Sequence, residues 1–265
     1  MALNDTKTAL ITGATSGIGY ELSRLFAQHG YDLVINARHE EDLVMVADEL
    51  EGAFGTSVVV VPEDLSERSA PERILSDVRE RSVEIDALVN SAGFGLRGPF
   101  AETDLVTELA MMEVNMVALT QLTKLVLGGM LERGSGRILN VASTASFLPG
   151  PLMAVYYATK AYVLSFSQAI ASELEGSGVS VTVLCPGPTD TSFQDRAGQT
   201  STWLLHLLAQ MEPERVARAG YQGMMEGQRV VFPGLRDRLT AFFQRFAPRA
   251  PLADGVRELH KRRSD

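Results

Sequence analysis

Hydrophobic and polar positions alternate in a regular order along the first two-thirds of the chain. Short runs rich in β-branched residues predict strands at 8–12, 33–35, 58–61, 87–89, 137–141 and 179–184. Between them, apolar residues recur at helical spacing, which predicts helices at 18–29, 40–50, 70–81, 105–131 and 154–174. Strands that are almost wholly apolar and alternate with helices are typical of a parallel sheet covered on both faces. Because crossovers between parallel strands are right-handed, we predict an α/β fold with a doubly wound, Rossmann-type sheet.

The pattern becomes less regular after Pro186, where helical pieces precede a short apolar run at 229–232. That run predicts a seventh strand. The sequence shows no internal repeat, no low-complexity linker and no change of composition that would mark a boundary. We therefore predict that residues 1–265 form a single domain around a sheet of about seven strands.

Composition narrows the class of protein. Of the 265 residues, 45% are hydrophobic, and the formal net charge is −9, which argues against a nucleic-acid partner. A single cysteine, Cys185, excludes an intrachain disulfide and fits a reducing compartment. The N-terminal residues lack a basic segment followed by an apolar one, and no apolar run approaches the roughly 18 residues of a membrane span. We expect a cytoplasmic protein.

A glycine-rich turn follows the first predicted strand and precedes a predicted helix. Gly13, Gly17 and Gly19 have the spacing Gly-x-x-x-Gly-x-Gly, which differs from the general dinucleotide pattern Gly-x-Gly-x-x-Gly. Free backbone N–H groups and the helix dipole make such a turn an anion site. The turn therefore predicts a phosphate-binding loop, although glycines are also common in purely structural turns.

The end of the second predicted strand bears on which cofactor such a loop would hold. A carboxylate there would bind a ribose 2′-hydroxyl, but the chain has Asn36, Ala37 and Arg38. A guanidinium group suits a 2′-phosphate, so the sequence favours NADP(H) over NAD(H). The alternative is that Arg38 is a solvated surface side chain.

Candidate acid–base chemistry lies near position 156. Tyr156 and Lys160 are four residues apart, on one face of a predicted helix. A free tyrosine has a pKa of about 10, which a neighbouring ammonium group would lower. Ser143 follows the fifth predicted strand, where its hydroxyl could bind a reacting oxygen or merely cap a turn. The four histidines are scattered without ligand spacing, so we predict no metal site.

Taken in order, these motifs resemble the short-chain dehydrogenase/reductase family over roughly residues 7–192. The loop from Gly13 to Gly19 is similar to the family's Thr-Gly-x-x-x-Gly-x-Gly motif, and Asn115, Ser143, Tyr156 and Lys160 match its catalytic residues. The segment 90–93 resembles Asn-Asn-Ala-Gly and departs from it only at Ser91. Ser16 stands where some NADP(H)-binding members carry a basic residue, so the choice of cofactor depends mainly on Arg38.

The resemblance implies a nicotinamide-dependent oxidoreductase. Tyr156 would give or take the hydroxyl proton, Ser143 would orient the substrate oxygen, Lys160 would also bind the nicotinamide ribose, and Asn115 would hold a water linked to Lys160. The residues expected to bind the cofactor are Gly13, Thr15, Ser16, Gly17, Ile18, Gly19, Arg38, Asp64, Leu65, Asn90, Ala92, Gly93, Tyr156, Lys160, Pro186, Gly187, Thr189 and Thr191. Asp64 and Leu65 would contact adenine, and the segment from Pro186 would hold the nicotinamide amide.

The substrate region and the C-terminal tail give weaker signals. Phe94, Phe147, Leu148 and Met153 flank the catalytic segments, and residues 191–212 correspond to the family's variable lid. We expect a mostly apolar small-molecule substrate, although the Leu-rich stretch at 202–208 fits a packed helix equally well.

The basic C-terminal extension at about 235–265 has eight Lys and Arg against three Asp and Glu between positions 236 and 263. Leu239, Phe242, Phe243 and Phe246 share one helical face there. We favour a helix docked on the core or on another subunit over contact with an anionic membrane. Vesicle co-sedimentation distinguishes the two, because equal pelleting of the full chain and a chain truncated at Arg236 would exclude the membrane.

Two functions remain open on the sequence. The first is an NADP(H)-dependent carbonyl reductase or alcohol dehydrogenase, assembled as a homodimer or homotetramer through helices like those at 105–131 and 154–174. The second is a catalytically silent NADP(H)-binding sensor or scaffold. A complete Asn-Ser-Tyr-Lys set favours the enzyme, because binding alone does not need it.

Overall fold

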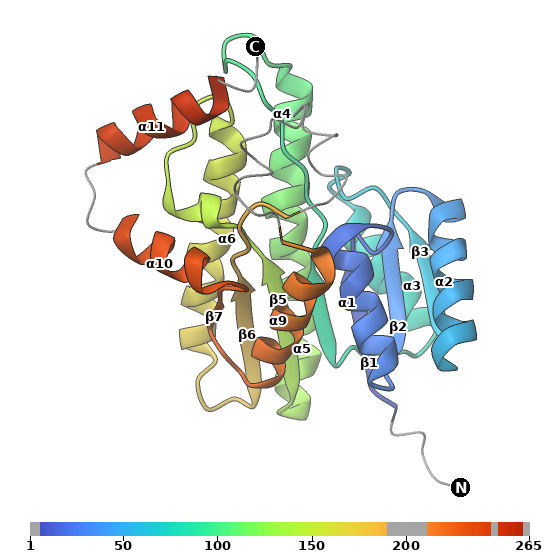
Figure 1. The fold of residues 1–265 in the computed structure, drawn as a ribbon. Helices are drawn as coiled ribbons and strands as arrows, with labels where there is room; N and C mark the ends of the chain where they lie inside the picture. The colour runs from blue at the N-terminus through green and yellow to red at the C-terminus, as the bar shows by residue number, and fades with distance from the viewer. Residues whose placement is uncertain (1–5, 190–210, 245–248, 262–265) are drawn as a thin grey trace, which may run out of the picture.

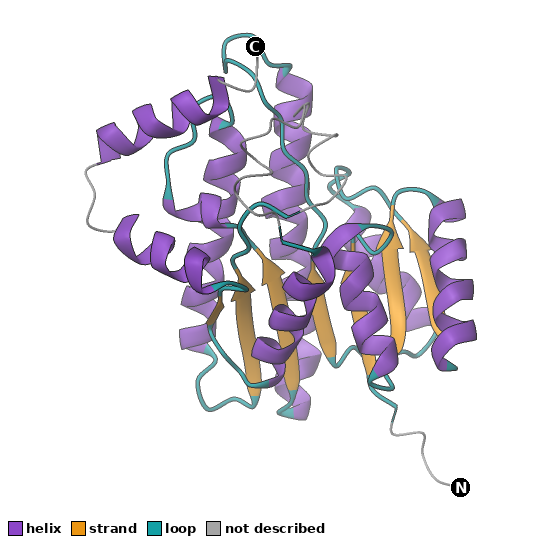
Figure 2. Cartoon of the chain, viewed as in Figure 1, coloured by secondary structure: helices purple, strands orange, loops and turns teal. Residues whose placement is uncertain are grey.

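The computed structural model describes residues 6–189, 211–244 and 249–261. These residues form one parallel sheet with the strand order β3-β2-β1-β4-β5-β6-β7 and helices on both faces (Figures 1 and 2). The predicted α/β doubly wound fold is confirmed. The strands are β1 Thr8–Thr12, β2 Asp32–Ala37, β3 Val58–Pro62, β4 Ala87–Asn90, β5 Gly136–Val141, β6 Val179–Leu184 and β7 Val230–Val231.

The helices follow the predicted positions closely up to residue 174. They are α1 Gly17–Gln28, α2 Glu40–Phe54, α3 Ala70–Glu80, α4 Leu105–Met112, α5 Leu119–Arg133, α6 Ala154–Glu173, α9 Pro213–Met225, α10 Leu235–Gln244 and α11 Arg249–Lys261. Two short elements were not predicted, the π-helix η1 (Glu113–Ala118) and the 3₁₀ turn η2 (Thr144–Phe147).

The sheet separates two apolar layers because successive side chains of a strand point to opposite faces. Ile11 of β1 packs with Phe26 of α1 in the layer that also holds α2 and α9. Leu10, its neighbour in β1, packs with Ile74 of α3 and Leu122 of α5 in the other layer. All are fully buried, and each such side chain contributes roughly 1.5–3 kcal/mol to folding.

Strand β1 lies at the point where the strand order reverses. It pairs with β2 on one side and with β4 on the other, so the loops after β1 and β4 leave the sheet in different directions. In open α/β sheets, ligands bind in the crevice outside the carboxyl ends of the strands at such a point. The glycine-rich turn after β1 therefore lies where the fold places a ligand.

The predicted helix at 105–131 is three consecutive helical segments, α4, η1 and α5. Its continuous span Leu105–Arg133 has 29 residues and contains an 18-residue window with a mean hydropathy of 1.3, so it is long and apolar enough to cross a membrane by length and composition. The sequence pattern did not predict this, because charged residues such as Glu113 and Lys124 interrupt the apolar runs of the helix. Part of the helix faces the core, where Met111, Leu122 and Val126 are buried, as in the core helix of a globular domain.

The C-terminal helices lie beside α6, near the carboxyl ends of the strands (Figure 1). In α10, Ala241 is buried, whereas Leu239 and Phe242 are 47% and 52% exposed. The predicted apolar face of this helix is therefore only partly covered by the described residues. The Phe243 side chain and Phe246 lie outside the part that the structure describes.

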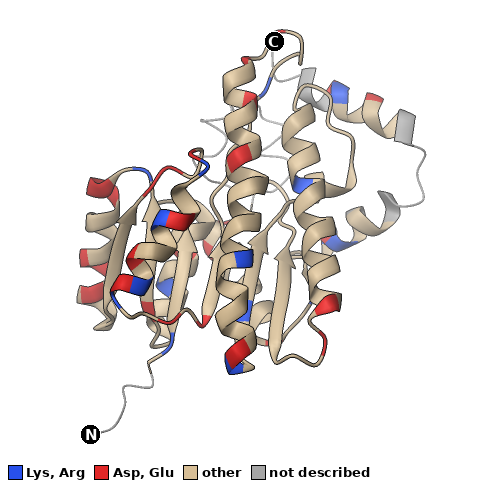
Figure 3. Cartoon of the chain, turned by 180° about the vertical axis from the view of Figure 1, so that it is seen from behind, with Lys and Arg blue, Asp and Glu red and all other residues tan. Residues whose placement is uncertain are grey.

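Charge is unevenly distributed over the helices. Figure 3 shows acidic positions gathered along α2, at the sheet edge that carries β3. The first turn of that helix contains Glu40, Glu41 and Asp42, and its last turn has no basic residue. Carboxylates in the first turn of a helix interact favourably with its dipole.

Candidate functional site

A cavity of about 680 Å³ lies at the carboxyl ends of the strands, beside the glycine-rich turn. It brings together residues from eight separate stretches of the chain. The predicted site residues that line it are Gly13, Thr15, Ser16, Gly17, Ile18, Gly19, Arg38, Asp64, Leu65, Ala92, Gly93, Ser143, Tyr156, Lys160, Pro186, Gly187 and Thr189. Asn90 and Asn115 lie behind the cavity wall, and Thr191 lies outside the described residues.

The glycine-rich turn has no room for side chains at two of its glycines. Gly13 has a positive φ of +68°, and a Cβ atom there would lie 2.9 Å from the Ala92 Cα. A Cβ at Gly19 would overlap the Gly13 carbonyl oxygen. Helix α1 begins at Gly17 and has no acidic residue in its first turn, so its N-terminal N–H groups face the cavity without a competing carboxylate. This turn fits a phosphate group.

Two polar residues that sequence reasoning missed hold the turn in place. The Asn36 carbonyl accepts hydrogen bonds from the Gly13 and Ala14 N–H groups at 2.8 and 3.2 Å. The Thr12 hydroxyl oxygen accepts from the N–H groups of Ser91 and Ala92, both at 3.1 Å. The turn is therefore fixed to β2 on one side and to the loop after β4 on the other.

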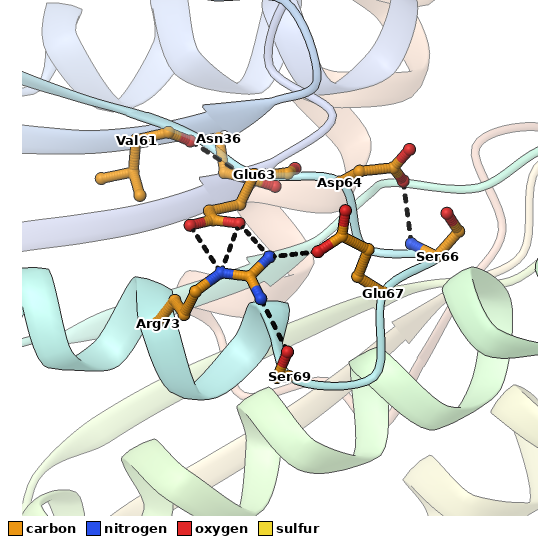
Figure 4. A network of polar contacts seen from close by, with 8 residues as sticks. All are labelled: Asn36, Val61, Glu63, Asp64, Ser66, Glu67, Ser69 and Arg73. Carbon is orange, nitrogen blue, oxygen red and sulfur yellow. Dashed lines mark hydrogen bonds and ion pairs between the residues drawn. The ribbon is translucent and has the colours of Figure 1, made fainter.

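The Asn36 side chain also shapes the part of the cavity beyond β2 (Figure 4). Its Nδ2 donates to the carbonyls of Val61 and Glu63 at 2.9 and 3.1 Å. The Glu63 carboxylate binds the Arg73 guanidinium, which also contacts Glu67. These bonds hold the loop after β3 against β2.

Asp64 lies at the start of that loop, and one of its carboxylate oxygens accepts the Ser66 N–H at 2.9 Å. The side chain therefore forms a local turn on the cavity wall. Neighbouring Leu65 is 5% exposed and packs in the layer that holds α3 and α5. Asp64 and Leu65 thus place one polar and one apolar residue on the cavity wall after β3.

Arg38 lines the cavity and is exposed. Among the residues that the structure describes, it has no hydrogen bond or ion pair. Neither Asn36 nor Ala37 offers a carboxylate at this strand end, although Asp42 of α2 also reaches the cavity. The guanidinium group is therefore available to an anion at this end of the site.

Ser143 and Tyr156 meet at the opposite end. Ser143 follows β5 and caps η2, where its oxygen accepts the Ala145 N–H at 3.1 Å. Tyr156 lies in the first turn of α6. Burial raises the pKa of Tyr156 above its ordinary value, whereas a hydrogen bond with Ser143 favours the tyrosinate and acts in the opposite direction. Ser143 is thus the group that opposes the effect of burial on the pKa of Tyr156.

Lys160 is buried one turn further along α6, and its Nζ lies 5.9 Å from the centre of the Tyr156 ring. The Nζ donates to the Val141 carbonyl at 2.8 Å. Burial lowers the pKa of Lys160 to about 8, and it raises the pKa of the adjacent Cys185 thiol to about 12. In this structure Lys160 is not among the groups that shift Tyr156, so its effect on the tyrosine pKa stays a prediction.

Asn115 lies within η1, directly behind the cavity wall at Gly93 and Phe94. Its Oδ1 accepts the Phe94 N–H at 3.1 Å, and its Nδ2 donates to the Phe94 carbonyl and the Thr159 hydroxyl at 3.0 and 3.1 Å. A Cβ atom at Gly93 would lie 3.0 Å from the Asn115 Oδ1. Asn115 therefore joins the loop after β4 to α6 directly beside Lys160.

Asn90 occupies a different place from the one expected of a cofactor ligand. It is 3% exposed, and its Nδ2 donates to the Asn140 Oδ1 and the Thr123 hydroxyl. Asn140 in turn donates to Ser167. The structure thus places Asn90 in a buried polar network between β4, β5 and the helices, away from the cavity.

The segment 186–189 closes the cavity beside Ser143. The Pro186 carbonyl accepts the Thr144 N–H at 2.8 Å, and the Thr189 hydroxyl donates to the Gly187 carbonyl at 3.0 Å. Residues 190–210 lie outside the described part of the chain, so most of the expected lid, with Phe193, is not described. Within the described ranges, no cluster of three or more His, Cys, Asp or Glu side chains suits a metal ion.

Comparisons with known proteins agree with this arrangement. The model of the short chain dehydrogenase family matches residues 7–202. The chain is 40% identical over 195 residues to a putative ketoacyl reductase of Streptomyces coelicolor, covering 72% of this chain and 74% of that protein. It is 36% identical over 189 residues, 71% of its length, to a short chain dehydrogenase of Pseudocercospora fijiensis, but the match spans only 61% of that longer protein.

A solved structure gives the same result for the fold. The short-chain dehydrogenase of Sphingobium yanoikuyae in complex with NADPH superposes with a TM-score of 0.81 and 32% identity, over 91% of this chain and 94% of that one. The family match includes both the glycine-rich turn and the Ser143, Tyr156 and Lys160 set. The chain therefore belongs to the short-chain dehydrogenase/reductase family.

Proposed function

We propose that the protein is an NADP(H)-dependent oxidoreductase that interconverts a carbonyl group and an alcohol. The observation that carries the proposal is the shared cavity. A phosphate-binding turn lies at one part of it, and Ser143 and Tyr156 face each other at another. When bound, the nicotinamide supplies or accepts the hydride. The chain's own residues then have to orient the substrate oxygen and move its proton.

The proton chemistry follows from the positions of the hydroxyl groups. In the reducing direction, the carbonyl carbon gains a hydride and the carbonyl oxygen gains a proton from the Tyr156 hydroxyl. Ser143 donates a hydrogen bond to the same oxygen and so stabilises the negative charge that develops there. Lys160 and Asn115 hold the tyrosine end of α6 in place. In the oxidising direction the proton returns to Tyr156.

Replacing Tyr156 separates the enzyme from a silent sensor. Tyr156→Phe removes the proton donor while keeping the ring, so we expect NADPH binding to persist and turnover to fall at least 10³-fold, as expected for loss of a general acid. Binding is measured by fluorescence titration, and turnover by nicotinamide absorbance on a panel of ketones and alcohols. Tyr20→Phe is the matched control, because Tyr20 bonds to Glu49 away from the cavity. A wild-type protein that binds NADPH but turns over nothing on the panel would favour the sensor.

The cofactor preference depends on Arg38. Solved neighbours of this fold hold NADPH in one case and NAD in another, so the fold itself does not decide the matter. Arg38 faces the cavity with no ion-pair partner among the described residues, and a charge-assisted bond to phosphate contributes about 1.5–3 kcal/mol. Arg38→Ala should therefore weaken NADPH binding at least tenfold and leave NADH binding nearly unchanged. Arg218→Ala, on the surface of α9, is the control; an equal loss for both cofactors in Arg38→Ala would refute the 2′-phosphate contact.

The substrate end of the cavity is mostly apolar. Its lining there includes Phe94, Leu96, Val114, Leu148 and Met153, which supports an apolar or mixed substrate. Phe147, also expected near the substrate, instead packs its ring against Phe232 at 5.9 Å. We propose that residues 191–212 cover the substrate, and the panel of ketones and alcohols with both cofactors identifies its class.

A second copy of the chain is the proposed partner. The outer face of α4 exposes Leu105, Val106 and Leu109, and contiguous exposed apolar side chains mark interaction surfaces. We propose that two copies pair through this face. We favour this over a membrane contact of the C-terminal helices.

A further inference from the structure

The first turn of α10 reaches back to the wall of the cavity from beyond the family match, which ends at residue 202. Three residues separate this helix from the end of β7, and it contacts η2, the turn that follows Ser143. Its third residue is Asp237. The C-terminal part of the chain therefore touches the segment that orients the catalytic serine.

The Asp237 carboxylate is half-buried against two glycines. Its Oδ1 would lie 2.5 Å from a Cβ atom at Gly187, and its Oδ2 would lie 3.0 Å from one at Gly234. The backbone N–H groups of Gly187 and Gly234 lower the pKa of this carboxylate, and its buried Oδ2 has no hydrogen-bond partner among the described residues. The absence of a side chain at Gly187 is what allows Asp237 to approach the backbone so closely.

Gly187 carries the only backbone N–H group between Cys185 and Thr189. It stands between Pro186 and Pro188, neither of which has a backbone N–H group. On the other side, the Pro186 carbonyl accepts the N–H of Thr144 and the hydroxyl of Ser143. Two elements thus hold the segment 186–189. The turn η2 holds it at the Pro186 carbonyl, and α10 approaches it at the Gly187 N–H.

We propose that Asp237 is a positioning residue that fixes the nicotinamide-facing segment 186–189 against Ser143 by accepting the Gly187 N–H. This inference rests on the proposed function, because it assigns Asp237 to the nicotinamide end of the same site. The adenine end lies at Arg38 and Asp64, which follow β2 and β3, whereas α10 follows β7 at the other edge of the sheet.

The balance of charges around Asp237 agrees with a held carboxylate. Burial raises the pKa of Asp237, while the two backbone hydrogen bonds and the nearby Arg236 and Arg215 lower it. Arg215 lies on α9 and Arg236 on α10 itself. An asparagine at this position keeps an oxygen that accepts the Gly187 N–H, whereas an alanine has none.

The test compares two ligands that share the adenine end but differ at the other. NADPH carries the nicotinamide, and adenosine 2′,5′-bisphosphate lacks it. In Asp237→Ala we expect the Kd for NADPH to rise five- to twentyfold and the Kd for the bisphosphate to stay within twofold of wild type. Asp237→Asn should restore NADPH binding to within about threefold of wild type. Leu239→Ala, an exposed neighbour on α10, should bind both ligands as wild type does.

Each other outcome has a definite meaning. If Asp237→Ala binds NADPH as tightly as wild type, or loses both ligands equally, or is not rescued by asparagine, the positioning role is wrong. If wild type binds neither ligand, the proposed function itself is wrong and this inference with it. If Asp237→Ala fails to fold, Gly187→Ala tests the same contact, because the added Cβ displaces the Asp237 carboxylate. Unchanged NADPH binding by Gly187→Ala would also overturn the proposal.

Discussion

Gly19 illustrates how a single position can depend on the backbone around it. A Cβ there meets the carbonyl oxygen of Gly13, and this residue cannot move away without disturbing the hydrogen bond that its N–H donates to the Asn36 carbonyl. We expect Gly19→Ala to lose roughly 1–3 kcal/mol in the free energy of unfolding and to weaken NADPH binding. Urea denaturation and fluorescence titration measure the two effects.

Gly52 provides the matched control for that substitution. It lies inside α2, and a Cβ there would meet nothing within 4 Å. Gly52→Ala should therefore stabilise the protein by about 0.5–1 kcal/mol through helix propensity. Equal effects at the two glycines would contradict the close approach at Gly19.

Lys160 gives a prediction about pH. Its pKa falls from 10.5 to about 8 on folding because it is buried. Between these two values the unfolded chain holds a proton that the folded chain has lost, so the free energy of unfolding should rise with pH by roughly 1–3 kcal/mol. Below about pH 8 both states are protonated and the slope from this group disappears. Lys160→Met should lack this rise. Urea denaturation of both proteins from pH 7 to 10.5 therefore gives the contribution of Lys160 as the difference between their free energies of unfolding. A difference that stays constant with pH would contradict the lowered pKa.

The residues of the site differ in how visible they are in the sequence. The glycine-rich turn and the Tyr156–Lys160 pair are local patterns, because their members lie within seven positions of each other. Thr12, Asn36 and Asp237 act through partners far away in the chain, such as the 80 positions between Thr12 and Ala92. No local pattern marks such a pair, so the groups that hold the site together became visible only in three dimensions.

At the scale of elements, strands were predicted almost to the residue and one helix was misread. Strands β1 and β6 have the predicted bounds, because buried parallel strands are unbroken apolar runs. In the helix from α4 to α5, a π-helix of six residues interrupts a pattern that still looks continuous. A π turn changes the hydrogen-bond partners of a few residues without breaking the apolar spacing over the whole helix.

Asn115 tests what that irregular element contributes. Asn115→Ala removes bonds to both backbone groups of Phe94 and to the Thr159 hydroxyl. Since several of these groups are then left without partners, we expect a loss of about 2–4 kcal/mol in the free energy of unfolding and a fall in kcat. Thr159→Val removes only the bond between Asn115 and the Thr159 hydroxyl. Loss of this bond should lower the free energy of unfolding by about 1 kcal/mol or less. Similar losses in the two variants, by urea denaturation, would show that the link to Phe94 contributes little.

At the scale of the whole molecule, the sequence established the order of layers but not the surfaces between copies. The alternation of strands and helices predicted a doubly wound parallel sheet, which the structure has, but the order of its strands came only from the structure. Helix α4 shows the limit of that reasoning. Its apolar residues fit equally well inside a core or on an exposed face, and only the structure shows that Leu105 and Val106 are exposed by 65% and 74%.

That exposed face leads to a prediction about assembly. Leu109, on the same helix, is 53% exposed, so a charge there is tolerated in a free monomer but is desolvated when two copies pair. A buried, unpaired carboxylate costs several kcal/mol, and in a symmetric dimer it occurs twice. Leu109→Glu should therefore shift the protein from dimer to monomer in light scattering after gel filtration. It should also leave the thermal unfolding midpoint high enough for a folded monomer to be seen.

Met45→Glu separates an interface effect from a general effect of added charge. Met45 is 64% exposed on α2. This helix lies beside the edge strand β3, away from α4, and already carries many carboxylates (Figure 3). Both variants change an exposed apolar side chain to the same acid, so they alter net charge equally. If only Leu109→Glu changes the mass in solution, the α4 face joins the copies. If both variants keep the wild-type mass, pairing occurs elsewhere. The next surface to test is then the partly uncovered face of α10, because Leu239 and Phe242 also expose apolar side chains there.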